Sequence, residues 1–266
     1  MDLNNKTILV TGADGGIGSA LCRALAREGA NLVLNSTNAQ RLDKLATELA
    51  SSGDAGAVST VAADVGSAEG RAGIVAECER LGGIDVLVNL AGVLDFQWFE
   101  QQDPERIETT LRINLLAPML LTQSLLPQLA SKKEATILNV GSIFASIGHP
   151  GFVTYCASKA GVKSFTEALG RELADTSIRV SYIAPRATAT TLNTDRINSM
   201  NRELGNSMDS PDYVAARIVS QLQNDGLLSY LGWPEKLFVR LNALLPSVVR
   251  KALVKNLGLI KQFASS

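Results

Sequence analysis

The 266-residue sequence is poor in the residues that bind metals or form disulfide bridges, with one histidine and three cysteines. The cysteines are scattered without the spacing of metal ligands. Their number is odd, and the sequence starts with the polar "MDLNNK" instead of the apolar region of a signal peptide, so both features predict a reducing compartment. His149 lacks the serine and aspartate arrangement that would make it a hydrolase base. We therefore expect no metal site, free thiols and a cytoplasmic protein.

Long apolar runs are also missing. No stretch reaches the roughly 18 uninterrupted apolar residues that a membrane-spanning helix requires. The longest candidate, residues 115–129, contains Thr122, Gln123 and Ser124 and predicts a buried core helix. The formal net charge of −1 predicts no general affinity for nucleic acid.

What the sequence does contain is an alternation of short apolar runs with amphipathic stretches: "TILVTG", "GSALCRALAREG", "ANLVLNS" and "AQRLDKLATELASSG". This alternation is typical of right-handed βαβ units. Later strands, such as "IDVLVNLAG" and "ATILNVGS", are nearly continuous apolar runs, as expected when both faces are covered. We predict an α/β fold with a single doubly wound parallel sheet and helices on both faces. The alternation ends near residue 230, so residues 231–266 are an extension of the same domain.

A glycine-rich turn, "TGADGGIG", follows the first predicted strand and opens the first helix. Gly12, Gly16 and Gly18 allow a tight turn and a close approach of the backbone to a pyrophosphate at the helix N-terminus. Elsewhere in a chain such a turn is an ordinary strand-to-helix connection. At the first βα junction it predicts a bound dinucleotide.

Tyr155 and Lys159 are four residues apart, so on a helix they lie on one face. The ammonium of Lys159 is expected to favour the phenolate and to lower the pKa of Tyr155 from about 10 toward the range of a general acid or base. Taken alone, the pair could equally lie on a helix surface. Ser142 and Asn114, whose places in the chain fit the family resemblance described next, favour the catalytic interpretation.

These motifs together resemble the short-chain dehydrogenase/reductase family over residues 6–230. The turn is similar to its TGxxxGxG, "NLAG" at residues 89–92 to its NNAG, and "YCASK" at 155–159 carries its tyrosine and lysine. "RIN", ending in Asn114, and "VGS", ending in Ser142, match its asparagine and serine. Leu90 departs from the pattern, and so does Arg186, which replaces a glycine after Pro185.

The resemblance implies a Rossmann fold and four catalytic residues. Tyr155 would exchange a proton with the substrate oxygen, and Ser142 would hydrogen-bond the same oxygen. Lys159 would bind the nicotinamide ribose, and Asn114 would anchor a water that leads from Lys159 to solvent.

The resemblance also implies a set of cofactor contacts, with Asp64 at the adenine and Thr190 at the nicotinamide carboxamide. The implied contacts are Gly12, Asp14, Gly16, Ile17, Gly18, Ser36, Thr37, Asp64, Val65, Asn89, Ala91, Gly92, Tyr155, Lys159, Pro185 and Thr190.

Which nicotinamide cofactor binds depends on the end of the second strand, "LNSTN". Ser36 stands where an acid would contact the adenosine ribose of NAD(H), and its absence removes a repulsion against the 2′-phosphate of NADP(H). Thr37 and Gly15 are not basic, and Asp14 weakly disfavours the phosphate, but Arg41 could reach it. The balance favours NADP(H), with NAD(H) as the alternative.

The Arg186 side chain could place a cation beside the cofactor or substrate, or it could point to solvent. We favour solvent, since charged side chains are usually exposed.

The segment from Thr191 to Met208 is polar and weakly patterned, as in a mobile lid.

Three functions are compatible with these residues. An oxidoreductase that interconverts a carbonyl and a secondary alcohol on an apolar substrate leads, ahead of a 3-oxoacyl-thioester reductase. A non-catalytic dinucleotide-binding sensor comes last, since such proteins typically lose the tyrosine or lysine. Relatives pair through the helices that contain Asn114 and Tyr155, so we also expect a homo-oligomer.

The carboxyl-terminal extension is basic and amphipathic. From Gly232 onward the sequence contains six basic residues and a single acid, Glu235. The formal charge of this segment is therefore +5, compared with −6 for the rest of the chain. From Pro246, one helical face carries an apolar stripe of Val249, Leu253, Leu257 and Ile260, with Gly258 weakening a long helix. Packing on its own domain or on a second subunit is favoured over peripheral contact with a membrane.

Overall fold

A computed structural model describes residues 1–264, and within them the strands form one seven-stranded sheet in which every neighbouring pair is parallel. The α/β prediction is confirmed. The apolar runs form the centre of the sheet, where β1, β4 and β5 are almost wholly buried, while the edge strand β3 is half-exposed. In spatial order the strands are β3 (Val58–Ala62), β2 (Asn31–Ser36), β1 (Thr7–Thr11), β4 (Val86–Asn89), β5 (Ala135–Val140), β6 (Ile178–Ala184) and β7 (Leu228–Tyr230).

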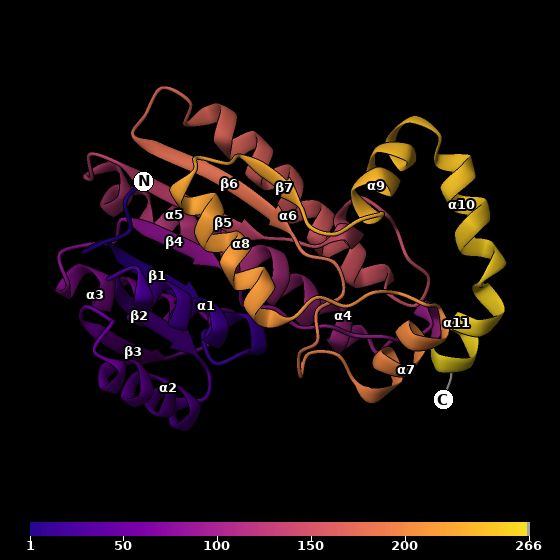
Figure 1. The fold of residues 1–266 in the computed structure, drawn as a ribbon, viewed down its shortest axis with the longest axis horizontal. Coiled ribbons are helices and arrows are strands. Elements are labelled where there is room, and N and C mark those ends of the chain that lie inside the picture. Colours follow the sequence, from indigo (N-terminus) through magenta and orange to yellow (C-terminus); the bar gives the residue numbers. More distant parts are fainter. Residues whose placement is uncertain (265–266) are drawn as a thin grey trace.

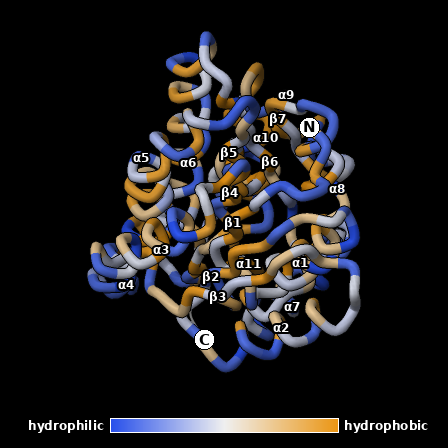
Figure 2. The backbone as a smooth tube through the Cα atoms, turned by 90° about the vertical axis from the view of Figure 1, so that its left-hand side faces the viewer, coloured by the Kyte–Doolittle hydropathy of each residue, from blue (hydrophilic) through white to orange (hydrophobic). Residues whose placement is uncertain are grey.

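Helices cover both faces of the sheet (Figure 1). On one face α1 (Gly16–Arg27), α2 (Ala39–Ser52) and α8 (Pro211–Gln223) enclose one apolar core. On the other face α3 (Ala68–Arg80), α5 (Ala117–Ala130) and α6 (Val153–Glu172) enclose a second. Figure 2 shows the hydrophobic strands at the centre and hydrophilic segments on the outside. Short 3-10 turns lie at η1 (Phe99–Gln101) and η3 (Ile143–Ala145).

The core helix predicted for residues 115–129 begins differently from the expectation. Between α4 (Pro104–Leu111) and α5 lies a π-helical turn, η2 (Arg112–Leu116). Pro118 cannot donate to the carbonyl of Asn114, and in a regular α-helix its ring would clash with that carbonyl. The wider π turn removes this conflict, and it carries Asn114 at its centre.

Up to residue 264, the carboxyl-terminal extension is helical and lies at one end of the molecule (Figure 1). Its helices are α9 (Glu235–Leu244), α10 (Pro246–Lys255) and α11 (Leu257–Ala264), and α11 packs against α7 (Asp195–Glu203). A helix starts at Pro246 as predicted, but Asn256 interrupts it. In the part of the chain that the structure describes, no helix is long and apolar enough to cross a membrane.

The predicted apolar stripe faces the rest of the chain. Val249 and Ile260 are buried in two separate apolar clusters, and Leu253 and Leu257 are half-buried. Packing of the stripe on its own domain, the favoured expectation, is therefore what the structure shows.

Candidate active site

The glycine-rich turn joins β1 to α1 and lies against the loop after β4. Gly12 has φ +68°, and a Cβ atom there would lie 2.9 Å from the Cα atom of Ala91. A Cβ atom on Gly18 would lie only 2.1 Å from the carbonyl oxygen of Gly12. Side chains would therefore fill this cradle, and glycines keep it open beside the free N–H groups at the start of α1. The cradle fits the pyrophosphate of a dinucleotide.

Hydrogen bonds fix the strand ends beneath this turn. The Thr11 hydroxyl accepts the N–H groups of Leu90 and Ala91, at 3.0 and 3.1 Å, and so joins β1 to the "NLAG" loop. The side-chain amide of Asn89 donates to Thr122 and Asn139, at 3.1 and 2.8 Å. In this structure, therefore, the Asn89 side chain ties β4 to α5 and β5.

Asn114 is hydrogen-bonded to the loop after β4 and to helix α6. Its side chain accepts the N–H of Val93 at 2.8 Å and donates to the Val93 carbonyl at 2.9 Å and to the Ser158 hydroxyl at 3.1 Å. Ser158 lies within the "YCASK" motif, but the sequence did not identify this role.

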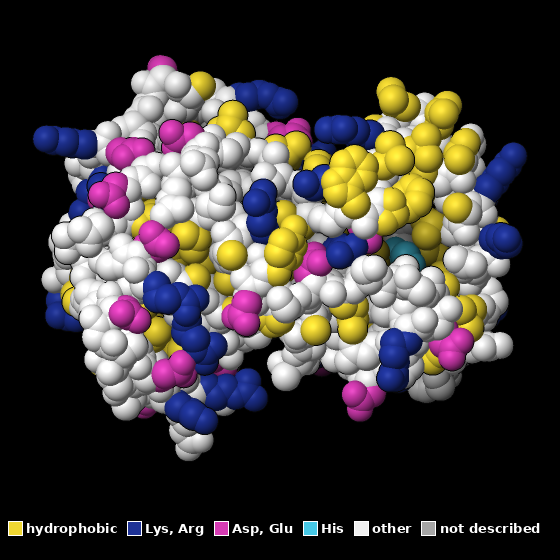
Figure 3. Space-filling view, viewed as in Figure 1, with side chains coloured by type: hydrophobic (Ala, Val, Ile, Leu, Met, Phe, Trp, Pro, Cys, Tyr) yellow, Lys and Arg dark blue, Asp and Glu magenta, His cyan; other side chains and the backbone are white. Residues whose placement is uncertain are grey.

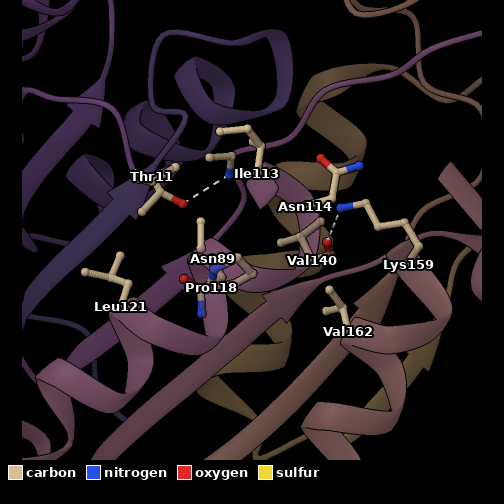
Figure 4. Close-up of a pocket in the computed structure, with 12 residues that line it drawn as sticks. Thr11, Asn89, Ile113, Asn114, Pro118, Leu121, Val140, Lys159 and Val162 are labelled. Atoms are coloured by element: carbon tan, nitrogen blue, oxygen red, sulfur yellow. Dashed lines mark hydrogen bonds between the residues drawn. The ribbon is translucent and has the colours of Figure 1, made fainter. Parts of the chain in front are cut away.

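A cavity of about 10 Å³ lies beside Asn114 and Lys159 and is also lined by Thr11, Val65 and Asn89 (Figure 4). That volume is close to the least that holds one water molecule.

Ser142, Tyr155 and Lys159 come together at the carboxyl end of β5 and the first turns of α6. The Lys159 ammonium donates to the Val140 carbonyl at 3.1 Å and lies 5.9 Å from the centre of the Tyr155 ring. The Ser142 hydroxyl caps η3 by accepting the N–H of Phe144 at 3.1 Å. The N–H of Ser142 donates to the buried Tyr182 hydroxyl at 3.3 Å, a supporting contact that the sequence did not predict.

The expected downward shift of the Tyr155 pKa is wrong for this structure. Burial raises the pKa of Tyr155 to about 12, and a hydrogen bond with Ser142 only partly opposes the increase. Burial also lowers the pKa of Lys159 to about 8. The spacing in the sequence placed both side chains on one helix face but could not show the cost of removing both groups from water, which sets the direction of each pKa shift.

At the adenosine end of the predicted cofactor site, Asp14 forms an ion pair with Arg41 at 3.6 Å. This pairing offsets the negative charge that we expected to disfavour a phosphate, and the Arg41 side chain is otherwise largely exposed. The Ser36 hydroxyl accepts the N–H of Asn38 at 3.1 Å. Farther along the sheet edge, the Asp64 carboxylate accepts the N–H of Gly66 at 2.7 Å and is exposed.

A pocket of about 600 Å³ opens above the catalytic candidates. Ser142, Tyr155 and Lys159 form part of its lining, as do Ile17, Gly92, Pro185 and Thr190 from the predicted cofactor contacts. His149, which stacks on Phe144 with 4.9 Å between ring centres, belongs to the wall. The extension also contributes to the lining, which sequence reasoning did not predict, mostly through apolar residues such as Leu241, Val249, Ala252, Leu253 and Ile260.

Arg186 does not point to solvent, contrary to the favoured expectation. Its guanidinium donates to Asp209 at 2.8 and 3.0 Å and to Glu235 at 3.2 and 3.3 Å. Its side chain is only 16% exposed, and the hydrogen bond with Asp209 raises its pKa. Arg186 therefore links the loop after β6 to the start of α9. The predicted lid between these elements contains α7, whose Ile197 and Met200 also line the pocket.

A doubly wound sheet, a glycine cradle at the first βα junction, and a serine, tyrosine and lysine lining one pocket define a dinucleotide-dependent oxidoreductase. Among residues 1–264, no group of three or more histidine, cysteine or acidic side chains is arranged to hold a metal ion.

Comparisons with known proteins agree with this class. The short chain dehydrogenase family model matches residues 6–201. Nodulation protein G of Rhizobium meliloti (strain 1021) is 36% identical over 204 residues, which cover 76% of this chain and 80% of that protein. The chain belongs to the short-chain dehydrogenase/reductase family and is an NAD(P)-dependent oxidoreductase.

Solved structures show the same similarity. A 3-ketoacyl-(acyl-carrier-protein) reductase from Brucella melitensis, complexed with NADH, superimposes with a TM-score of 0.78 at 27% identity, covering 88% of this chain and 99% of that one. A short-chain dehydrogenase from Sphingobium yanoikuyae, in complex with NADPH, gives a TM-score of 0.77 at 26% identity, covering 94% and 96%. Structures with either cofactor therefore resemble this chain.

Proposed function

We propose that the protein interconverts a carbonyl and a secondary alcohol on an apolar substrate, with Tyr155 as the general acid or base and NADP(H) favoured over NAD(H). One observation carries the proposal: Ser142, Tyr155 and Lys159 line the same pocket of about 600 Å³, whose lining surface is mostly apolar. A mostly apolar pocket with some polar groups suits a mostly apolar molecule that carries a reacting oxygen.

The side chains divide the chemistry between them. When bound, the nicotinamide supplies or accepts the hydride. Tyr155 gives a proton to the substrate oxygen during reduction and takes it back during oxidation, and Ser142 hydrogen-bonds that oxygen as its charge changes. Burial raises the pKa of Tyr155 and so favours the protonated phenol, which is the form that donates a proton during reduction. Lys159 and Asn114 border the water-sized cavity, where Asn114 would anchor a water next to Lys159.

Support for NADP(H) comes from Ser36 and Arg41. Ser36 leaves the end of β2 without an acid, and Arg41, near the start of the following helix α2, pairs with Asp14 but is largely exposed. A mostly exposed guanidinium can turn from the carboxylate to a 2′-phosphate with little rearrangement.

We propose that residues 1–230 bind the cofactor and carry the chemistry, while residues 231–266 shape the substrate pocket. The partners we propose are a small apolar substrate and further copies of the chain, in the cytoplasm, with peripheral membrane contact through the extension. Nucleic acid is not among them.

The test is Tyr155→Phe, assayed by the near-ultraviolet absorbance of reduced nicotinamide with a panel of ketones and secondary alcohols. Turnover should fall by about 10²-fold or more while cofactor binding is retained. Tyr213→Phe, an exposed tyrosine in α8, is the matched control and should change nothing. If the unmodified protein binds NADPH or NADH but turns over no substrate, the non-catalytic sensor is supported instead.

A 3-oxoacyl-thioester reductase is the second candidate, supported by the similarity to the Brucella melitensis reductase. Comparing a 3-oxoacyl thioester with the simple ketone of the same chain length separates the two. A much higher kcat/KM for the thioester would favour the second candidate.

A further inference from the structure

We propose that the outer face of α9 and α10 is a surface for anionic membranes, and that the substrate pocket opens at this surface. The binding surface stands on its own observations. The arrival of substrate from the membrane rests on the proposed function.

The first observation is a group of large apolar side chains left exposed at the extension. Leu244 is 80% exposed, and Trp233 is 66% exposed. The members of this group, called here the outer apolar surface, are Trp233, Leu237, Phe238, Leu244, Leu245 and Val248. Figure 3 shows hydrophobic side chains gathered over α9 and α10. This face is distinct from the stripe of Val249 and Ile260, which is buried against the rest of the chain.

The second observation is charge. Figure 3 shows Lys and Arg side chains beside the apolar group over α9 and α10, and the single acid in the sequence of the extension, Glu235, is bound by Arg186. The basic residues of α9 and α10 are Lys236, Arg240, Arg250, Lys251 and Lys255. An apolar face bordered by cations is complementary to a bilayer with negatively charged headgroups.

The charge also decides between a membrane and a second copy of the chain. In a two-fold contact the same surface meets itself, so two basic faces would be brought together. Like charges facing each other oppose such a contact, whereas anionic lipids neutralise them. A lipid surface is therefore the occupant that fits.

The third observation connects this surface to the catalytic pocket. Phe238 and Val248 belong to the outer apolar surface, being 43% and 48% exposed, and both also line the pocket of about 600 Å³. His149 lines the same pocket, and Figure 3 shows histidine atoms in a hollow next to the apolar group. The rim of the pocket is thus part of the surface, and an apolar substrate dissolved in the bilayer can enter without crossing water.

The experiment is vesicle flotation of the full-length protein, with vesicles of phosphatidylcholine alone or mixed with phosphatidylglycerol. The protein should float with the mixed vesicles at low salt, remain behind with phosphatidylcholine alone, and be released at high salt. Leu244→Ser should weaken binding about tenfold, since an inserted leucine side chain is lost. Arg250→Gln combined with Lys251→Gln should weaken it about thirtyfold.

Matched controls lie elsewhere on the protein. Leu227→Ser alters another exposed leucine, and Arg27→Gln combined with Lys44→Gln removes two exposed charges on α1 and α2. Neither control should change flotation. Absence of flotation at low salt, or equal losses in variants and controls, would overturn the proposal. So would a Leu244→Ser variant that changes the oligomeric state but not vesicle binding, because a second copy would then be the occupant.

Activity separates this proposal from the proposed function. With a short ketone dissolved in water, Leu244→Ser should match the unmodified protein. With a long-chain ketone carried in mixed vesicles it should be about tenfold slower. Flotation without turnover of either ketone would count against the oxidoreductase chemistry alone. Turnover of the short ketone without flotation would count against the membrane surface alone.

Discussion

Replacing Arg186 with methionine is expected to destabilise the protein and to loosen the extension from the pocket. Arg186 holds Asp209 with two hydrogen bonds and Glu235 with two longer ones, and it also donates to the Trp233 carbonyl at 3.3 Å. Methionine fills a similar space but provides no charge and no donor. Asp209 would then be a negative charge on a side chain that is only 8% exposed.

The magnitude follows from that burial. Asp209 already has one buried oxygen, Oδ2, that accepts no hydrogen bond from the described residues. Leaving its other oxygen unpaired should cost about 3 kcal/mol, as expected when one partner of a buried ion pair is removed. Glu235 is more exposed, so Glu235→Gln should cost about 1 kcal/mol or less.

Urea unfolding of the three variants Arg186→Met, Glu235→Gln and Arg186→Met/Asp209→Asn tests this order. The double variant should recover about 1 to 2 kcal/mol of the loss, since it removes the stranded charge. Proteolysis should cut the extension faster in Arg186→Met than in Glu235→Gln. The reasoning fails if Arg186→Met costs less than 1 kcal/mol, or if the double variant is no more stable than the single one.

Two further changes probe the cofactor site and the buried lysine. Ser36→Asp should raise KM for NADPH about tenfold or more and lower KM for NADH, because a carboxylate repels the 2′-phosphate and accepts the ribose hydroxyls. An unchanged ratio of the two KM values would contradict this. Lys159→Met should be more stable than the unmodified protein at pH 7 by about 1 to 3 kcal/mol, because folding lowers the lysine pKa from 10.5 to about 8 and so opposes burial of the ammonium. The unmodified protein gains stability as pH rises from about 8 toward 10, because its buried lysine then loses its proton. The difference in unfolding free energy between Lys159→Met and the unmodified protein should therefore narrow over this range. A difference that urea unfolding finds to be the same at every pH would refute the argument from the buried ammonium.

Local chemistry explains which parts of the site could be predicted from the sequence. The glycine turn follows from steric demands within seven residues, and the pairing of Tyr155 with Lys159 follows from the helical repeat. Ser142 and Asn114 were added through the resemblance to the short-chain dehydrogenase/reductase family, because each stands where that family keeps its serine or asparagine. The alternation of apolar runs was enough for the fold, because a parallel sheet buries whole strands.

What could not be predicted depends on residues far apart in the chain. The direction of the Tyr155 pKa depends on how much protein surrounds its hydroxyl, which no local pattern shows. The partners of Arg186 lie 23 and 49 residues away, so an arginine in place of the usual glycine gave no sign of its ion pairs. Likewise, the stripe from Val249 to Ile260 could be identified as apolar, but its position against the catalytic pocket follows only from the path of the chain after β7.

The interruption at Asn256, between α10 and α11, has a consequence for how the substrate specificity of this protein could be altered. A straight helix would touch the pocket along one line, but the break lets two short helices wrap around it and contribute Val249 and Ile260 from different directions. The groups that handle the proton all precede β6. Replacing the segment after Gly232 with that of another reductase would therefore change the lining of the pocket and leave those groups in place. Substrate specificity can thus change, in evolution or by design, through this segment alone.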